Sequence, residues 1–141
     1  MIEQSELRMM RLGSAVLSLG VLGLLAAGSA LAADYELEIK FEGNCPVEVI
    51  DKGNSCEAVG ESEGRDKACA RPNDKLVWKS NPEGKSFTLY FDPLKGGPKY
   101  KGSDGEYSRH IDEDAPIAEY KYTIVSPGCE PFDPRIVIRP N

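Results

Sequence analysis

The stretch DYELEIKFE, residues 34–42, alternates apolar and charged side chains without a break. The apolar positions are held by Tyr35, Leu37, Ile39 and Phe41, and each is separated from the next by a glutamate or a lysine. Successive side chains of a β-strand point to opposite faces, so this period predicts a strand with one buried face and one solvated face. Strands of this kind are typical of antiparallel sheets that cover a core on one side only.

The chain after this stretch repeats the pattern in shorter segments that are separated by turn signals. Pro72-Asn73-Asp74 and the Asn-Pro-Glu-Gly segment 81–84 are typical of turns. Residues 52–71 are predicted to form a polar loop with at most one helical turn, and residues 92–106 a second loop rich in glycine and lysine. Further strands are predicted over residues 46–51, 76–78, 86–91, 107–111, 118–125 and 135–139. Seven or eight short strands at even spacing predict an all-β Greek-key sandwich.

The segment before residue 34 carries a different signal. Leu12 to Ala33 contains no charge, Arg8 and Arg11 precede it, and Ala30-Leu31-Ala32 fits the small-x-small pattern that a signal peptidase cleaves. This combination predicts a secretory signal peptide over residues 1–33, with cleavage near Ala32 or Ala33. A retained membrane anchor is the alternative, since the run is long enough to span a bilayer. Cleavage would leave residues 34–141 as one periplasmic or secreted domain that is not attached to the membrane.

The composition of the 141 residues narrows the classes of partner. Seventeen Lys and Arg stand against 23 Asp and Glu, which gives a formal net charge of −6. Nucleic-acid binding needs a basic surface, so we expect no nucleic-acid partner. The chain has one His, and its three Met all lie within the first ten residues. These counts disfavour most metal-binding and acid–base chemistry, and we expect no enzymatic activity.

Four cysteines lie after the predicted signal peptide: Cys45, Cys56, Cys69 and Cys129. An even number in an exported chain predicts two disulfides, because the compartment outside the inner membrane is oxidising. No Cys-x-x-Cys pair is present, which disfavours a zinc ribbon or a thioredoxin-type redox site. Spacing alone leaves all three pairings open.

Several motifs together resemble a known family. Residues 72–81 (PNDKLVWKSN) resemble a tryptophan-bearing strand, residues 119–124 (EYKYTI) a Tyr-x-Tyr strand, and residues 136–138 (IVI) a closing strand, all in the order found in cupredoxins. The resemblance implies an eight-stranded Greek-key sandwich over nearly all of residues 34–141. It also implies disulfides between Cys45 and Cys129 and between Cys56 and Cys69, at opposite ends of that sandwich.

The copper site of that family does not carry over. A blue-copper centre needs two imidazoles, one thiolate and a weak axial ligand that is often Met. Phe87 stands where the family has its first His ligand, and no His or Met follows Cys129. The resemblance therefore implies the fold without a type 1 copper ion, and we expect no cofactor.

Two polar groups are candidate sites. His110 lies between Ser108 and Asp112, but no G-x-S-x-G elbow accompanies it, so a solvated surface His is favoured over a catalytic one. The acidic turn 112–114, with Asp104 nearby, offers oxygens to Ca²⁺ but lacks the EF-hand spacing. A solvated acidic turn is therefore the favoured interpretation. Trp78 lies in the middle of a strand and is predicted to pack in the core.

One loop is the best candidate for recognition. Lys95, Lys99, Tyr100 and Lys101 make residues 95–102 basic and glycine-rich in an acidic chain. It lacks the ending of a phosphate-binding loop, and a solvated connection is the competing interpretation. We hypothesise an exported non-enzymatic binding or accessory module that uses the end loops 95–106 and 126–134 to bind an envelope or extracellular partner. The alternative is a weak copper- or zinc-handling protein that uses His110 with carboxylates, or unpaired cysteines.

Overall fold

The structure, a computed structural model, describes residues 31–91, 100–102 and 104–141. Its elements, in chain order, are β1 (Asp34–Glu42), β2 (Cys45–Asp51), α1 (Ser55–Ala58), β3 (Lys67–Ala70), β4 (Lys75–Asn81), β5 (Phe87–Tyr90), β6 (Tyr100–Gly102), β7 (Glu106–His110), β8 (Glu119–Lys121), β9 (Thr123–Val125) and β10 (Arg135–Ile138). The predicted all-β class is confirmed, with α1 as a single helical turn. Within the described part of the chain, no helix is long and apolar enough to cross a membrane.

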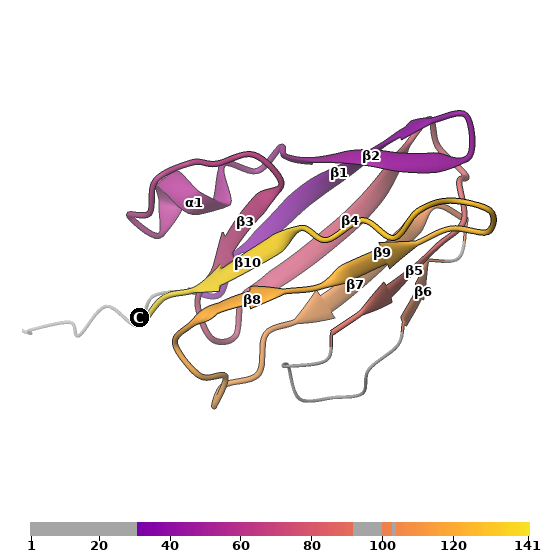
Figure 1. Ribbon diagram of the computed structural model, residues 1–141. Helices are drawn as coiled ribbons and strands as arrows, with labels where there is room; N and C mark the ends of the chain where they lie inside the picture. Colours follow the sequence, from indigo (N-terminus) through magenta and orange to yellow (C-terminus); the bar gives the residue numbers. More distant parts are fainter. Residues whose placement is uncertain (1–30, 92–99, 103) are drawn as a thin grey trace, which may run out of the picture.

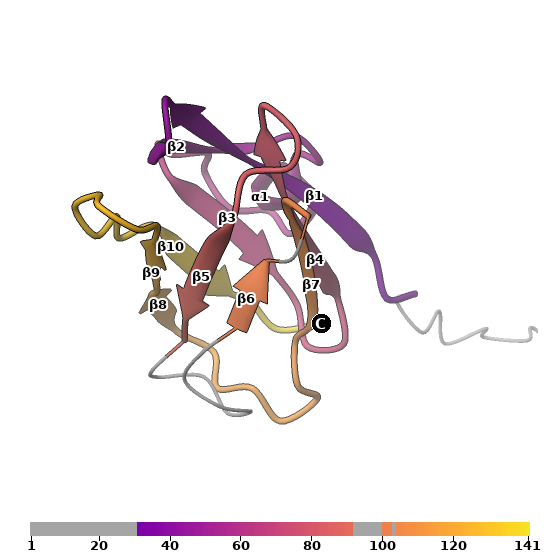
Figure 2. The ribbon, with the colours of Figure 1, turned by 90° about the vertical axis from the view of Figure 1, so that its right-hand side faces the viewer.

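The strands form two layers (Figure 1). One layer is a four-stranded sheet in the order β2-β1-β4-β7, in which β1 and β4 are parallel and the other pairs are antiparallel. The other layer contains two three-stranded sheets, β3-β10-β8 and β6-β5-β9. Only Tyr122 separates β8 from β9, so the two small sheets follow one another along the same layer. Figure 2 shows β6 beside β7, where the two layers meet along one side of the sandwich.

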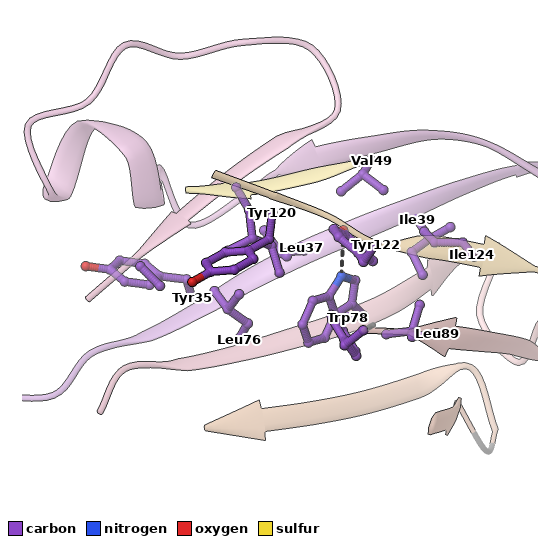
Figure 3. Packing of buried hydrophobic residues seen from close by; sticks show 14 of the residues in the cluster. Tyr35, Leu37, Ile39, Val49, Leu76, Trp78, Leu89, Tyr120, Tyr122 and Ile124 are labelled. Carbon is purple, nitrogen blue, oxygen red and sulfur yellow. Dashed lines mark hydrogen bonds between the residues drawn. The ribbon is translucent and has the colours of Figure 1, made fainter. Parts of the chain in front are cut away.

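The core lies between the layers and is built from the alternating positions of the strands. Leu37 and Ile39 of β1 are completely buried, as the period of that stretch predicts, and they face residues of β8 and β9 (Figure 3). Trp78 is also completely buried, so its predicted role in the core is confirmed. Its indole Nε1 donates a hydrogen bond of 3.0 Å to the Tyr122 hydroxyl, which joins the two layers through the core (Figure 3).

The predicted strand count of seven or eight is too low, because the described residues alone form ten strands. Two of the additional strands, β3 and β6, lie in segments that were predicted to be loops. The sequence of β3 is KACA, and all four of its residues are buried. Ala68 and Ala70 belong to the main core, whereas Cys69 packs against Cys56 in a small second cluster beneath α1. A short strand that is covered on both faces has no alternation for the sequence to show.

Two disulfides join Cys45 to Cys129 and Cys56 to Cys69, which is the pairing that the family resemblance implies. We call them the hairpin-end disulfide and the helix-end disulfide, since the first lies beside the β1–β2 hairpin and the second beside α1. α1, which carries Cys56, and the β1–β2 hairpin, next to Cys45, lie at opposite ends of the sandwich (Figure 1). The two disulfides close loops of very different length, with sequence separations of 84 and 13.

Buried hydrogen bonds fix the segment around the helix-end disulfide. The Asp51 carboxylate accepts hydrogen bonds from the Ser55 backbone N–H at 3.0 Å and from the Ser55 hydroxyl at 2.8 Å. The hydroxyl oxygen of Ser55 in turn accepts a hydrogen bond of 2.9 Å from the backbone N–H of Cys69. The short helix is therefore held by this network and by the disulfide, since four residues are too few for a helix to be stable by itself.

Candidate functional site at the hairpin end

The two end loops that are predicted to carry recognition both adjoin the small sheet β6-β5-β9. Val125, which precedes the loop 126–134, pairs with Thr88 near the start of β5. Tyr100, which begins β6, pairs with Leu89 near the end of β5. Gly102, which ends β6, pairs with Phe87, so this described part of the first loop lies at the same end of β5 as Ser126. Residues 95–99 and 103 of the first loop lie outside the described residues, so its predicted role in recognition stays a prediction.

The residues predicted for the basic loop fall into two groups. Lys95 and Lys99 lie outside the described residues. Tyr100 and Lys101 belong to β6, whose backbone pairs with β5. For these two residues the prediction of a loop is wrong, because a third strand extends this small sheet at its edge.

Loops from distant parts of the chain meet at the hairpin end and surround a hollow of about 400 Å³. It is lined by Asn44 after β1, by Gly84, Lys85 and Ser86 before β5, and by Ser126 and Pro127 after β9. The hairpin-end disulfide lies next to this hollow and ties the β1–β2 hairpin to the loop 126–134. We call this hollow the hairpin-end groove.

Close packing holds the β4–β5 side of the groove in place. The Ser80 hydroxyl accepts a hydrogen bond of 3.0 Å from the Lys85 backbone N–H, and the Ser80 backbone N–H donates to the Gly105 carbonyl at 2.7 Å. Gly105 has a φ of +76°, and a Cβ atom there would lie 2.3 Å from the Ser80 hydroxyl oxygen. Only glycine fits this position, both for its left-handed backbone and for the space around it.

The groove presents one positive charge and a largely neutral lining. The Lys85 ammonium donates a hydrogen bond of 3.0 Å to the side-chain oxygen of Asn44, across the mouth of the groove. The Ser126 hydroxyl, itself buried, donates to the Ser86 carbonyl at 3.0 Å. The remaining lining consists of glycine, proline and serine, which leaves backbone groups close to the surface. Such a lining suits a polar ligand with a carboxylate or carbonyl oxygen for Lys85.

A second hollow, of about 210 Å³, lies between β2 and the loop that follows α1. Its lining is more strongly charged, and two of these charged residues, Asp51 and Lys67, already contact other parts of the protein. Lys67 donates to the Ser62 carbonyl at 2.7 Å and contacts Glu61 at 3.3 Å, and the Asp51 carboxylate accepts the hydrogen bond from the Ser55 backbone N–H. Hydrogen bonds from Arg139 and Lys67 hold the pKa of Glu61 below its usual value. This hollow is therefore better explained by structural ion pairs than by ligand binding.

The other candidate residues lie away from the groove. His110 is exposed, and its backbone position in β7 pairs with Lys75 at the far end of β4. Asp104 precedes β7, whereas Asp112 follows it, so the expected acidic cluster is divided between the two ends of a strand. Asp104 is therefore not near the turn 112–114. Among the described residues, no three of His, Cys, Asp and Glu gather where they could hold a metal ion.

The donor set of a blue-copper centre does not fit these residues. Cys129 is bonded to Cys45, so its sulfur is not available as a thiolate. Phe87 is buried in the core and has no donor atom, and His110 lies at the opposite end of the four-stranded sheet. No step of a mechanism through copper follows from this arrangement.

Sequence reasoning missed most of the groove. Lys85 and Ser86 follow the turn signal at 81–84, and Asn44 immediately precedes Cys45. The sequence indicates the groove only indirectly. Once Cys45 and Cys129 are paired, the residues next to them must lie close together. Nothing in the local sequence brings Lys85 to Asn44, because that contact depends on how β4 and β5 cross the end of the sandwich.

Comparisons with known proteins add little to this geometry. No protein-family model matches the sequence, and no curated protein matches it. Solved structures with some similarity include an oxidised methionine-to-leucine mutant of amicyanin, at 12% identity and a TM-score of 0.39, covering 73% of this chain and 81% of that one. They also include a reduced proline-to-phenylalanine mutant of amicyanin, at 12% identity and a TM-score of 0.38, covering 74% and 82%. Values this low carry no function over from amicyanin to this chain.

Proposed function

We propose that this chain is an exported, non-enzymatic binding or accessory module, built on a cupredoxin-like sandwich without copper, that recognises a partner at the hairpin-end groove. The observation that carries the proposal is the groove itself. Three loops that are distant in sequence are brought together there beside the hairpin-end disulfide, around the half-buried Lys85. Binding residues often lie on loops that a rigid scaffold positions, and a disulfide lowers the entropy cost of ordering them.

Export is supported by the sulfur chemistry. Both disulfides use all four cysteines of the chain, and structural disulfides persist in oxidising compartments such as the periplasm or the extracellular space. The leader-like residues 1–33 agree with this location. The partner is therefore expected in the cell envelope or outside the cell.

The non-enzymatic part of the proposal rests on the geometry of the groove. The Ser126 hydroxyl already donates to a backbone carbonyl, and His110 lies at the opposite end of the molecule. A serine nucleophile needs a base within hydrogen-bond distance, and none of the described residues supplies one to Ser126. The alternative of weak copper or zinc handling has no thiolate to use. Thiol counting and metal analysis of the exported protein test it, and a stoichiometric metal with free thiols would favour it.

Site-specific photocrosslinking in the exporting cell tests the proposed groove. A photoreactive amino acid would replace Ser86 in the groove or, as a matched control, Lys40, which is exposed on β1 outside the groove. We expect a discrete crosslinked product from position 86 only, which Lys85→Ala weakens because the ammonium is lost. Equal crosslinking at both positions, or a product at position 86 that Lys85→Ala leaves unchanged, would contradict recognition at this groove.

A further inference from the structure

Ala33, the residue immediately before β1, forms two hydrogen bonds with the turn that precedes β4. The backbone nitrogen of Ala33 donates to the Oδ1 atom of Asp74 at 2.9 Å. The carbonyl oxygen of the same residue accepts a hydrogen bond of 2.8 Å from the backbone N–H of Lys75. Ala33 is thus anchored on both sides, whereas Leu31 and Ala32 before it are exposed. Leu31 is 92% exposed, which is unusual for a large apolar side chain.

Asp74 is buried, with 4% of its surface exposed. Its Oδ2 atom accepts a hydrogen bond of 2.8 Å from the Arg71 backbone N–H, and its Oδ1 atom accepts the one from Ala33. The salt bridges among the described residues do not include Asp74. A buried carboxylate that has only backbone donors lacks the opposite charge that usually accompanies one.

We infer that the leader is cleaved between Ala32 and Ala33, and that the new α-ammonium of Ala33 forms a part-buried ion pair with Asp74. Hydrolysis by a signal peptidase breaks the peptide C–N bond, and water supplies a hydroxyl to the Ala32 carbonyl and a proton to the Ala33 nitrogen. The amine then takes one more proton near neutral pH. The nitrogen that donated as a neutral amide becomes a cation at the position where Asp74 lacks one.

The sequence independently supports cleavage of the peptide bond between Ala32 and Ala33. Cleavage after Ala32 places Ala30 and Ala32 at the two positions that signal peptidases require to be small. Cleavage one residue later would place Leu31 at the first of them and would remove both hydrogen bonds of Ala33. The inference rests on the export half of the proposed function and is independent of the groove.

Several other charged and titratable groups surround the pair and act on it. Asp34 lies next to Ala33 on β1 and pairs with the Lys75 ammonium at 2.8 Å. Arg71 and Tyr35 line the same small hollow of about 60 Å³ as Ala33 and Asp74, and Asn141 lines it as well. Burial first, and then the charge of Asp74, raise the pKa of the Tyr35 hydroxyl, while the charge of Arg71 lowers it.

The first test is the mass and N-terminal sequence of the protein made as the full chain and recovered after export. A product that begins at Ala33 is expected. A product that begins at Asp34 would overturn the inference but would leave export intact. A product that retains residues before Ala33 would overturn the inference, and an uncleaved chain held inside the cell would overturn export too.

The second test measures the pKa of the α-amine, for instance by NMR of the ¹³C-dimethylated protein. The nearby carboxylate should raise this pKa by about one unit or more in the folded protein relative to the urea-unfolded chain, a comparison that needs no variant. Asp74→Asn should remove the shift, whereas Asp34→Asn, which alters an exposed carboxylate on the neighbouring residue, should keep most of it. An α-amine with the same pKa folded and unfolded, or an equal loss in both variants, would overturn the ion pair.

Discussion

Replacing Tyr122 by phenylalanine would remove one oxygen atom from the core. Tyr122 is 2% exposed, and its hydroxyl accepts the 3.0 Å hydrogen bond from the indole nitrogen of Trp78, which is completely buried. In the variant this N–H group loses its acceptor in a region that water does not reach. Leaving a buried donor without a partner costs about 1–3 kcal/mol. In a domain of this size, about 1 kcal/mol lowers the melting temperature by roughly 4 °C.

The expected loss can be measured by urea unfolding followed by far-UV circular dichroism. The fluorescence of Trp78, the only tryptophan in the chain, gives a second probe of the same transition. Tyr120→Phe is the matched control: its hydroxyl donates 2.8 Å to the carbonyl of Pro116, an exposed residue whose oxygen can bind water instead. Tyr122→Phe should lower the free energy of unfolding clearly more than the control does. An equal or smaller loss would refute the assigned role of the Trp78–Tyr122 hydrogen bond.

Three further measurements address other parts of the fold. Burial raises the pKa of Tyr122, so above about pH 10 the folded protein keeps a proton that the unfolded chain releases. The free energy of unfolding should therefore fall as the pH rises. Tyr122→Phe should reduce this fall, which unfolding midpoints measured from pH 8 to 11 would show. Replacing the cysteines of the hairpin-end disulfide by alanine should lower the free energy of unfolding by about 4.5 kcal/mol, against about 3 kcal/mol for the helix-end disulfide. The hairpin-end disulfide should contribute more because it closes the longer loop. The reverse order would contradict the loop-entropy explanation. Gly105→Ala should lower the melting temperature far more than Gly43→Ala, since both have positive φ but only position 105 lacks room for a Cβ atom; equal shifts would mean that the close packing there is unimportant.

The sequence was informative wherever one face of a strand meets water. The alternation in β1 predicts its buried positions because its outer face carries glutamates and lysines that remain solvated. β3 carries no such contrast, since the core covers one side of it and α1 covers the other. Its strand character depends on pairing with β10, a segment more than 60 residues away. A pattern read along the chain cannot contain this information, because the covering elements come from elsewhere.

The same reasoning explains which parts of the candidate site could be predicted. The cysteines are visible in the sequence, and the family resemblance implies how they pair. The groove beside them depends on the contact between Lys85 and Asn44, which only the assembled strands bring together. Asp74 was predicted to be part of a turn, and it is, but the turn also carries a buried carboxylate. Turn chemistry predicts the backbone shape, whereas burial depends on the start of β1, which packs over the turn.

The two ends of the sandwich can be tested separately because one strand separates them. β1 has nine residues between the Ala33–Asp74 contact and the hairpin that borders the groove, which corresponds to about 30 Å of extended chain. Sites so far apart with no shared partners usually make additive contributions. Asp74→Asn should therefore change the α-amine without changing crosslinking from position 86, and Lys85→Ala should do the reverse. If either variant altered both measurements, β1 would have to transmit a change from one end to the other, and the groove could no longer be treated as a preformed site.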